Sequence, residues 1–248
     1  MSEHRAAIPL DECDPAEVTS RIRPSRGAPG HVVFVGTGLG GPLRLTLAGL
    51  QTIADADVLV LSPELSPDLL GEPEVSCDPD APVLLAAVDP DLDKVAQLAM
   101  AGFSVAWLVA GDPMIDGEAE PLAVGLVDRG CRLDVVPGLP KATLALTASG
   151  ISDGNRLWWM TRDPELAEVP PNIMALLQAD QVAELARQAR DRGLPTDMPA
   201  LVTVNYASSA QRSIETTLGG LAQAAEDCDG RSLAVVVGEA ARRDPRLN

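Results

Sequence analysis

Continuous apolar stretches alternate with amphipathic segments along this chain, and that alternation restricts the folds available to it. HVVFVG at residues 31–36 and DVLVLS at 57–62 are typical of strands buried on both faces, and LRLTLAGLQTIADA between them predicts an amphipathic helix. Apolar strands separated by helices predict an α/β fold with a mainly parallel sheet covered on both faces. The same order continues with a helix at 89–102, a strand at 104–113, a helix at 120–130, a strand at 131–138 and a helix at 140–150.

A change in the residue pattern after residue 150 predicts a second α/β unit. A Pro-rich stretch leads to a segment at 173–193 that contains a long amphipathic helix, and the strand ALVTVN, a helix at 216–227 and the strand LAVVVGEA follow. We therefore predict an N-terminal subdomain at 31–139 and a C-terminal subdomain at 140–248, each a mainly parallel sheet flanked by helices. A small-molecule site is expected in the cleft between them. Residues 1–30 lack apolar periodicity, which predicts a flexible N-terminal arm.

The acidic charge narrows the classes of partner. The formal net charge is -17 and the only lysines are Lys94 and Lys141, so a surface that follows nucleic-acid phosphates is not expected. The sequence has no apolar run of about 18 residues, so no membrane span is predicted. The acidic start does not resemble a secretory signal, and we therefore expect a cytoplasmic protein. The four cysteines lie far apart without a CxxC pair, which predicts reduced thiols and no metal site.

A glycine-rich loop follows the first strand. Gly36, Gly38 and Gly41 have the GxGxxG spacing of dinucleotide-binding loops. That fold places a ribose-binding acid at the end of the second strand, where this sequence has Leu61 and Ser62. The same glycines also suit a tight loop whose backbone approaches another ligand closely, or a plain strand-to-helix turn. The spacing alone leaves a nicotinamide oxidoreductase and both other interpretations open.

Five separated stretches resemble the tetrapyrrole (corrin/porphyrin) methylases, in the order that this family has them. VFVGTGLGGPLRLTLAGLQTIADADVLVL resembles the opening strand and GxGPGDP loop, LVAGDPMIDGEAEPL the GGDP block, and VVPGLPKATLALTASGI the VVPG block. DMPALVTVNYASSAQRSIETTLGGL and LAVVVGEAARRDPRLN resemble the two C-terminal blocks. Their QR and LN pairs favour the uroporphyrinogen III C-methyltransferase branch. The resemblance spans residues 32 to 248.

The resemblance implies a two-domain class III methyltransferase fold that forms a homodimer and binds S-adenosylmethionine as methyl donor, with the tetrapyrrole beside it. The implied reaction is C-methylation of uroporphyrinogen III to precorrin-2, on the way to sirohaem and cobalamin. An alternative is a catalytically impaired paralogue that binds the donor, its demethylated product or a tetrapyrrole as a regulatory or scaffold subunit. Fusion to, or association with, another tetrapyrrole-pathway enzyme is also open.

The resemblance also assigns site residues. The family's aspartate at the end of the second strand falls on Ser62, its downstream lysine has no counterpart before Asp93, and Glu64 is the candidate replacement for the missing base. Asp112 has a second interpretation, because Asp-Pro after a strand is also a common structural turn. Candidates for binding tetrapyrrole carboxylates are Arg44, Arg156, Arg162 and Arg212. The family's donor-binding positions fall on Leu39, Gly40, Ala110, Gly111, Asp112, Ile115, Pro140, Lys141, Leu177 and Tyr206.

Overall fold

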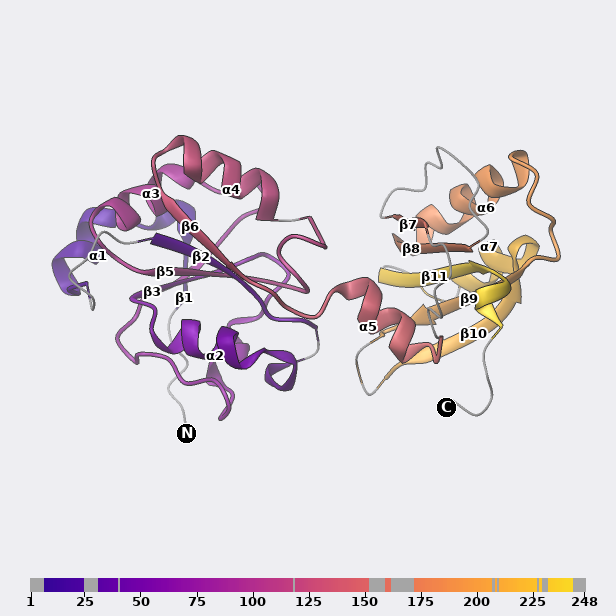
Figure 1. Cartoon of the computed structure of the whole chain (residues 1–248), viewed down its shortest axis with the longest axis horizontal. Helices are drawn as coiled ribbons and strands as arrows, with labels where there is room; N and C mark the ends of the chain where they lie inside the picture. The colour runs from indigo at the N-terminus through magenta and orange to yellow at the C-terminus, as the bar shows by residue number, and fades with distance from the viewer. Residues whose placement is uncertain are drawn as a thin grey trace. The chain divides into compact units, whose positions relative to one another are not determined.

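The computed structural model divides into two compact units, Met1–Lys141 (unit 1) and Ala142–Asn248 (unit 2) (Figure 1). The residues that the structure describes are 7–24, 31–39, 41–117, 119–151, 159–161, 172–206, 208, 210–226, 228 and 232–242.

Unit 1 is built on a six-stranded sheet. Its strands are β1 (Ala7–Pro9), β2 (His31–Gly36), β3 (Val58–Leu61), β4 (Val83–Leu85), β5 (Val105–Val109) and β6 (Arg132–Val136). The order across the sheet is β1-β4-β3-β5-β2-β6, and every neighbouring pair is parallel. The mainly parallel sheet predicted for the first half of the chain is therefore confirmed. Strand β4 was not foreseen, because three residues are too few to show a pattern.

Helices cover both faces of this sheet (Figure 1). On one face, Val32 and Phe34 of β2 share a core with α3 (Leu92–Met100) and α4 (Ala119–Asp128). On the other face, Val33 and Val35 pack with α2 (Leu47–Ala54). Because both faces of β2 are covered, its central residues Val32 to Val35 are all apolar, which explains the continuous apolar run in the sequence.

The N-terminal segment is not the flexible arm that the sequence analysis predicted, because residues 7–24 fold onto unit 1. Strand β1 pairs with β4 at the edge of the sheet. Helix α1 (Pro15–Arg21) follows, and the Asp14 side chain accepts a hydrogen bond from the Ala16 N–H at 2.9 Å. Leu10, Cys13 and Val18 are buried in the same core as α3. These three apolar side chains hold the segment without the regular spacing that a sequence pattern can detect.

Unit 2 contains a five-stranded sheet that corrects the sequence prediction. Its strands are β7 (Trp159–Thr161), β8 (Asn172–Gln178), β9 (Pro199–Val204), β10 (Arg212–Thr217) and β11 (Ser232–Gly238), in the order β10-β9-β11-β8-β7. Only β7 and β8 pair in parallel; β11 is antiparallel to both β8 and β9, and β10 is antiparallel to β9. A mainly parallel sheet was therefore wrong for this unit.

The physical reason lies in the connections and in the burial. A parallel crossover needs about a dozen residues, and the short link from Val204 to Arg212 allows only a hairpin. The sheet is covered on both faces, by α6 (Val182–Asp191) and α7 (Leu221–Glu226) on one and by α5 (Lys141–Ala148) on the other. Strands buried on both faces are apolar whichever way they run, so their composition does not report their direction. The apolar start of the 173–193 segment is likewise strand β8, and α6 begins only at Val182.

The helices are short, from six residues in α7 to ten in α4 and α6. Within the described ranges, none is long and apolar enough to cross a membrane. Single 3-10 turns complete the fold at Leu10–Glu12, Pro42–Arg44, Pro67–Gly71, Ala179–Gln181, Leu218–Gly220 and Glu239–Ala241.

All four cysteines are free thiols, and Cys13, Cys131 and Cys228 are buried. Desolvation by burial raises the pKa of the Cys13 and Cys131 thiols above its ordinary value, which keeps them neutral. These two side chains are therefore parts of the core of unit 1 and not reactive groups.

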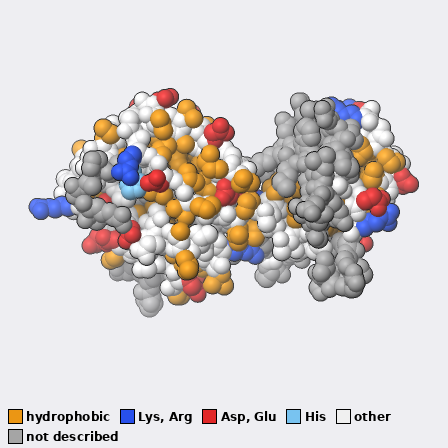
Figure 2. Space-filling model, viewed as in Figure 1, with side chains coloured by type: hydrophobic (Ala, Val, Ile, Leu, Met, Phe, Trp, Pro, Cys, Tyr) orange, Lys and Arg blue, Asp and Glu red, His pale blue; other side chains and the backbone are white. Residues whose placement is uncertain are grey.

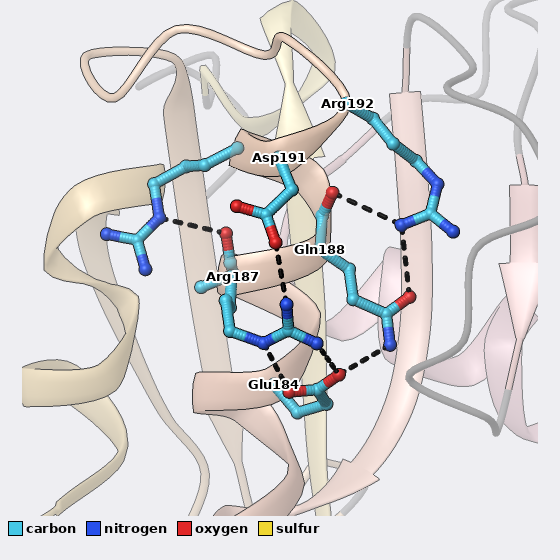
Figure 3. A network of polar contacts seen from close by, with 7 residues as sticks. Glu184, Arg187, Gln188, Asp191 and Arg192 are labelled. Atoms are coloured by element: carbon cyan, nitrogen blue, oxygen red, sulfur yellow. Dashed lines mark hydrogen bonds and ion pairs between the residues drawn. The ribbon is translucent and has the colours of Figure 1, made fainter.

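The exposed face of α6 carries a polar network (Figure 3). Glu184 accepts hydrogen bonds from Arg187 at 2.8 and 2.5 Å and from Gln188 at 2.6 Å, and Arg187 also reaches Asp191 at 2.6 Å. The bond from Arg187, followed by that from Gln188, lowers the pKa of Glu184 to about 2. Because these charges are solvated, we assign the network to support of the helix and not to a binding site.

The packing of the N-terminal segment predicts the effect of Leu10→Ala. Leu10 is fully buried, so its truncation should lower the free energy of unfolding by about 2–5 kcal/mol. Val88→Ala is the control, because Val88 is 92% exposed and its truncation should change stability by less than about 0.5 kcal/mol. Urea unfolding followed by circular dichroism measures both. Equal stabilities of the two variants would mean that the segment does not belong to the folded core.

Candidate functional site

Three loops meet at the carboxyl ends of β2, β5 and β6, and glycines allow them to touch backbone to backbone. Gly38 donates its N–H to the Gly111 carbonyl at 3.1 Å, and Gly111 donates back to the Gly38 carbonyl at 2.8 Å. A Cβ atom on Gly36 would lie 2.7 Å from the Gly111 carbonyl oxygen, and one on Gly138 would lie 2.7 Å from the Gly36 carbonyl carbon. Real Cβ atoms do not approach that closely. The close contact between the loop backbones therefore requires glycine at these positions, Gly36, Gly111 and Gly138.

The glycine loop does not lead into a helix in the way that a dinucleotide-binding loop does. Gly41, with φ +111°, precedes the 3-10 turn Pro42–Arg44, and α2 begins only at Leu47. The pyrophosphate of a dinucleotide binds at the N-terminus of the helix that directly follows the glycines. The local structure therefore does not favour a nicotinamide cofactor.

Two buried aspartates hold the loop that follows β5. Asp112 accepts hydrogen bonds from the backbone N–H groups of Met114, Ile115 and Gly138 at 2.9, 2.8 and 3.1 Å. Asp116 accepts from the N–H of Asp112 at 2.7 Å and from that of Lys141 at 3.1 Å. Both Asp112 oxygens thus bond the backbone, which favours the structural interpretation of this residue. The sequence analysis did not identify Asp116. The only sequence feature that could have indicated it is that it is a second acid, four residues after Asp112 in the same loop.

A cavity of about 240 Å³ opens beside the glycine loop. Ligand pockets for drug-sized molecules measure roughly 300–1,000 Å³, so this cavity is large enough for part of such a ligand. Its lining joins the loop after β2 to the segment after β3, at the carboxyl ends of parallel strands, where α/β folds commonly bind ligands. The lining residues are Thr37, Gly38, Leu39, Gly41, Pro42, Glu64, Leu65, Ser66, Leu69 and Glu72.

The two candidate acid–base residues have different surroundings. Ser62 is buried, and its hydroxyl accepts a hydrogen bond from the Trp107 indole N–H at 3.2 Å. Glu64 lines the cavity, and its carboxylate forms an ion pair with the Lys141 ammonium at 2.5 Å. Of the two, Glu64 is the acid, and it belongs to the residues that line the cavity. The sequence did not reveal its pairing with Lys141, because the two residues lie 77 positions apart.

The predicted donor-binding residues of unit 1 lie at several depths. Leu39 lines the cavity, Ala110 is fully buried, Pro140 is half-buried, and Ile115 is exposed. Gly111 uses its N–H and carbonyl in the contact with Gly38, so its backbone is already bonded. Gly40 lies outside the described residues. The structure thus places Leu39 and Glu64 in the lining of the cavity. Lys141 is next to the cavity through its ion pair with Glu64.

The two donor-binding candidates of unit 2 differ from each other. The Leu177 side chain is buried in the core that β8 shares with α6 and α7. Tyr206 is half-buried and packs against the core on the α5 face of the sheet. Their contact with a methyl donor stays a prediction.

The arginine candidates are also dispersed. Arg44 donates a hydrogen bond to the Leu39 carbonyl and so braces the glycine loop. Arg212 is exposed at the start of β10. Arg156 and Arg162 lie outside the described residues. A role for any of them toward tetrapyrrole carboxylates stays a prediction.

Comparison with known proteins assigns most of the chain to one family. The model of the tetrapyrrole (corrin/porphyrin) methylases matches residues 31–222. Siroheme synthase from Escherichia coli O139:H28 is 27% identical over an alignment of 244 residues, and the match covers 88% of this chain and 52% of that protein. The chain therefore spans about half the length of the curated relatives it matches.

Solved structures share the fold. Cobalt precorrin-4 methyltransferase, a cobalamin biosynthetic enzyme, superposes with a TM-score of 0.72 at 21% identity, over 85% of this chain and 95% of its own. Uroporphyrin-III C-methyltransferase from Thermus thermophilus also gives 0.72, at 24% identity, over 85% and 96%. The same Thermus enzyme in complex with S-adenosyl homocysteine gives 0.65, at 21% identity, over 86% and 99%.

The backbone contact of the three loops predicts the effect of Gly138→Ala. The added methyl group would meet the backbone of Gly36 and Gly111, which cannot move aside as a flexible side chain can. We expect a loss of about 1–3 kcal/mol in the free energy of unfolding. Gly71→Ala is the matched control, since a Cβ there meets no atom within 4 Å. Thermal unfolding compares them, and a Gly138→Ala protein as stable as Gly71→Ala would contradict the close contact.

Proposed function

The chain belongs to the tetrapyrrole (corrin/porphyrin) methylases, and from that membership we propose that it transfers methyl groups from S-adenosylmethionine to carbon atoms of uroporphyrinogen III, forming precorrin-2. The family is one of S-adenosylmethionine-dependent methyltransferases that act on tetrapyrroles. The particular acceptor is a proposal that the sequence blocks of the C-terminal half support. The observation that supports an active enzyme is that an acidic residue, Glu64, lines a cavity at the ends of parallel strands.

The residues of unit 1 fit part of a methyl donor. The backbone of the glycine loop and Leu39 line the cavity, and the α-carbon of Gly41 has open space around it, since a Cβ there would meet no atom within 4 Å. Lys141 compensates the charge of Glu64, so the negative charge of the lining comes from the Glu72 carboxylate, and it suits a cationic group. When bound, S-adenosylmethionine supplies a methyl group on a positively charged sulfur.

Glu64 is the residue of this chain that we assign to proton transfer. Methylation of a pyrrolic carbon is completed by loss of a proton from the ring system, and a carboxylate can accept that proton. The Glu64 side chain is 54% exposed, so the proton can pass on to water. Ser62, which occupies the family's aspartate position, lacks an activating base, because its described partner is the indole N–H of Trp107.

The alternative function is that of a catalytically impaired paralogue. The buried Ser62 hydroxyl favours it, because the carboxylate that the family has at this position is missing. Such a protein would bind S-adenosylmethionine, its demethylated product or a tetrapyrrole and act as a regulatory or scaffold subunit. Binding without turnover separates this function from that of the enzyme.

We also propose that the partner of this chain is a second copy of itself. Figure 2 shows hydrophobic side chains gathered on the face of unit 1 where α4 and β6 lie. Val124 and Val127 of α4 and Val135 of β6 are among the exposed apolar residues. Contiguous exposed apolar surface is typical of protein interfaces. A homodimer is the assembly that the family resemblance implies.

The dimer predicts that Val127→Asp shifts the protein toward the monomer, because a buried unpaired carboxylate is costly. Sedimentation velocity at equal protein concentrations measures this. The control is Val88→Asp, at a highly exposed position outside α4 and β6, which should sediment as the wild type does. A wild-type monomer at tens of micromolar, or a dimer that persists in Val127→Asp, would rule out this interface.

The proposed reaction is tested by calorimetric titration with S-adenosylmethionine and its demethylated product, followed by anaerobic incubation with uroporphyrinogen III and mass analysis. We expect donor binding and a product that has gained one or two methyl groups. Glu64→Gln should lower turnover by about 100-fold, as expected for loss of a proton-transfer group. Asp93→Asn is its control, since Asp93 forms an exposed pair with Arg129 elsewhere in unit 1.

Two other outcomes of the titration and the methylation assay would lead to different conclusions. Binding of the donor without methyl transfer would favour the impaired paralogue. Failure to bind either form of the donor and the tetrapyrrole would remove both functions and leave only the family fold.

A further inference from the structure

The ion pair between Glu64 and Lys141 is strongly asymmetric in burial. The Lys141 side chain is 7% exposed, whereas that of Glu64 is 54% exposed. Burial of an ammonium group costs several kcal/mol unless a counter-charge and hydrogen bonds compensate it. An exposed glutamate has no such need of a partner. Lys141 is therefore the member of the pair that the fold holds in place, and Glu64 is the member that faces the cavity.

The backbone of Lys141 is anchored separately from its ammonium group. Its N–H donates to both carboxylate oxygens of Asp116, at 3.3 and 3.1 Å. Asp116 also binds the N–H of Asp112, so that the start of α5 is bonded to the loop after β5. Lys141 is thus held at the backbone by one acid and at the end of its side chain by another.

The route of the Lys141 side chain depends on a glycine. A Cβ atom on Gly111 would lie 2.0 Å from an Asp116 carboxylate oxygen and 2.9 Å from the Lys141 Cγ atom, so any larger residue at 111 would displace both side chains. Gly111 has φ +81°, a conformation that also favours glycine. The location of the Lys141 side chain, between Asp116 and Glu64, therefore depends on the glycine at position 111.

From these contacts we propose that Lys141 is a positioning residue for methyl transfer, which holds the Glu64 carboxylate beside the glycine loop, where Glu64 accepts the proton that the methylated ring loses. This inference rests on the proposed function. It adds a role for Lys141 that differs from the donor contact implied by the family resemblance.

The proposed step is balanced. An electron pair of the acceptor ring carbon forms the new bond to the methyl carbon, while the carbon–sulfur bond breaks and its electrons stay on sulfur, which becomes neutral. The ring system, now cationic, loses a proton to the Glu64 carboxylate and becomes neutral again. The glutamic acid then releases this proton to water. Proton transfer requires the carboxylate within hydrogen-bond reach of its target, so fixing its location contributes to the rate.

Glu72 provides a comparison within the same cavity. It also lines the cavity, and Glu72→Gln removes one negative charge, as Glu64→Gln does, but leaves the pair of Glu64 with Lys141 intact. If negative charge alone mattered, the two substitutions would have similar effects. If the held carboxylate matters, the loss in Glu72→Gln should be at least tenfold smaller than that in Glu64→Gln.

The test compares Lys141→Met, Lys141→Arg, Glu64→Gln and Glu72→Gln with Arg129→Met. Arg129 is the distal control, because it pairs with Asp93 at 2.5 Å and both side chains are more exposed than Lys141. For each protein, kcat and KM for methylation of uroporphyrinogen III are measured, together with calorimetric affinity for the demethylated donor. The signal of the Glu64 carboxyl carbon is followed by NMR in protein labelled with 13C at this carbon, and its absence from Glu64→Gln assigns it.

We expect Lys141→Met to lower kcat by about 10- to 100-fold, as misplacement of a reacting group does, while affinity for the demethylated donor changes less than about threefold. Lys141→Arg keeps the positive charge and should recover most of the loss. The Glu64 carboxyl signal should move in Lys141→Met and stay unchanged in Arg129→Met. A kcat in Lys141→Met equal to that of Arg129→Met, or a loss confined to donor affinity, would overturn the positioning role.

Failure of the proposed function is recognisable separately. A wild-type protein that transfers no methyl group removes the base role of Glu64 together with the proposed reaction. In that case the carboxyl signal still decides whether Lys141 holds Glu64. A signal that does not respond to Lys141→Met overturns that part as well.

Discussion

The backbone contact of Gly36, Gly111 and Gly138 determines how the carboxyl edge of the first sheet is built. Because these residues have no side chains, three loops approach to distances that a Cβ atom would forbid. Asp112 and Asp116 then bond the loops through backbone N–H groups. Buried carboxylates are stable only when such donors surround them, so the loops and the acids require each other. The cavity beside the glycine loop depends on this arrangement.

The same loops also determine the location of the charged side chains at the site. Asp116, in the loop after β5, binds the Lys141 N–H, and the absence of a side chain at Gly111 leaves space for the lysine side chain. A buried ammonium needs a counter-charge, and Glu64 provides it from the segment after β3. The acid at this edge therefore stands two residues beyond Ser62, the position that the family resemblance assigns to it. A shift of two positions in a loop is compatible with a carboxylate at the same edge of the sheet.

The first sheet was largely predictable, and the second was not. In unit 1, strands such as β2 and β5 are buried on both faces and are joined by helices, so their apolar runs indicated a parallel sheet correctly. In unit 2 equally apolar strands run antiparallel, because β11 lies between β8 and β9 and a short link joins β9 to β10. The N-terminal segment was also misjudged, since Leu10 and Val18 are buried without a regular spacing.

The sequence by itself determined the family, the glycine positions and the alternation of apolar strands with helices, because motif and periodicity are properties of neighbouring residues. It also indicated Glu64 as the nearest acid after the missing aspartate. Only the tertiary structure decided that the Ser62 hydroxyl accepts a hydrogen bond from Trp107 and that Glu64 pairs with Lys141, 77 positions away. Hydrogen bonds and ion pairs act over a few ångströms in space, and distance along the chain carries no information about them once the chain has folded.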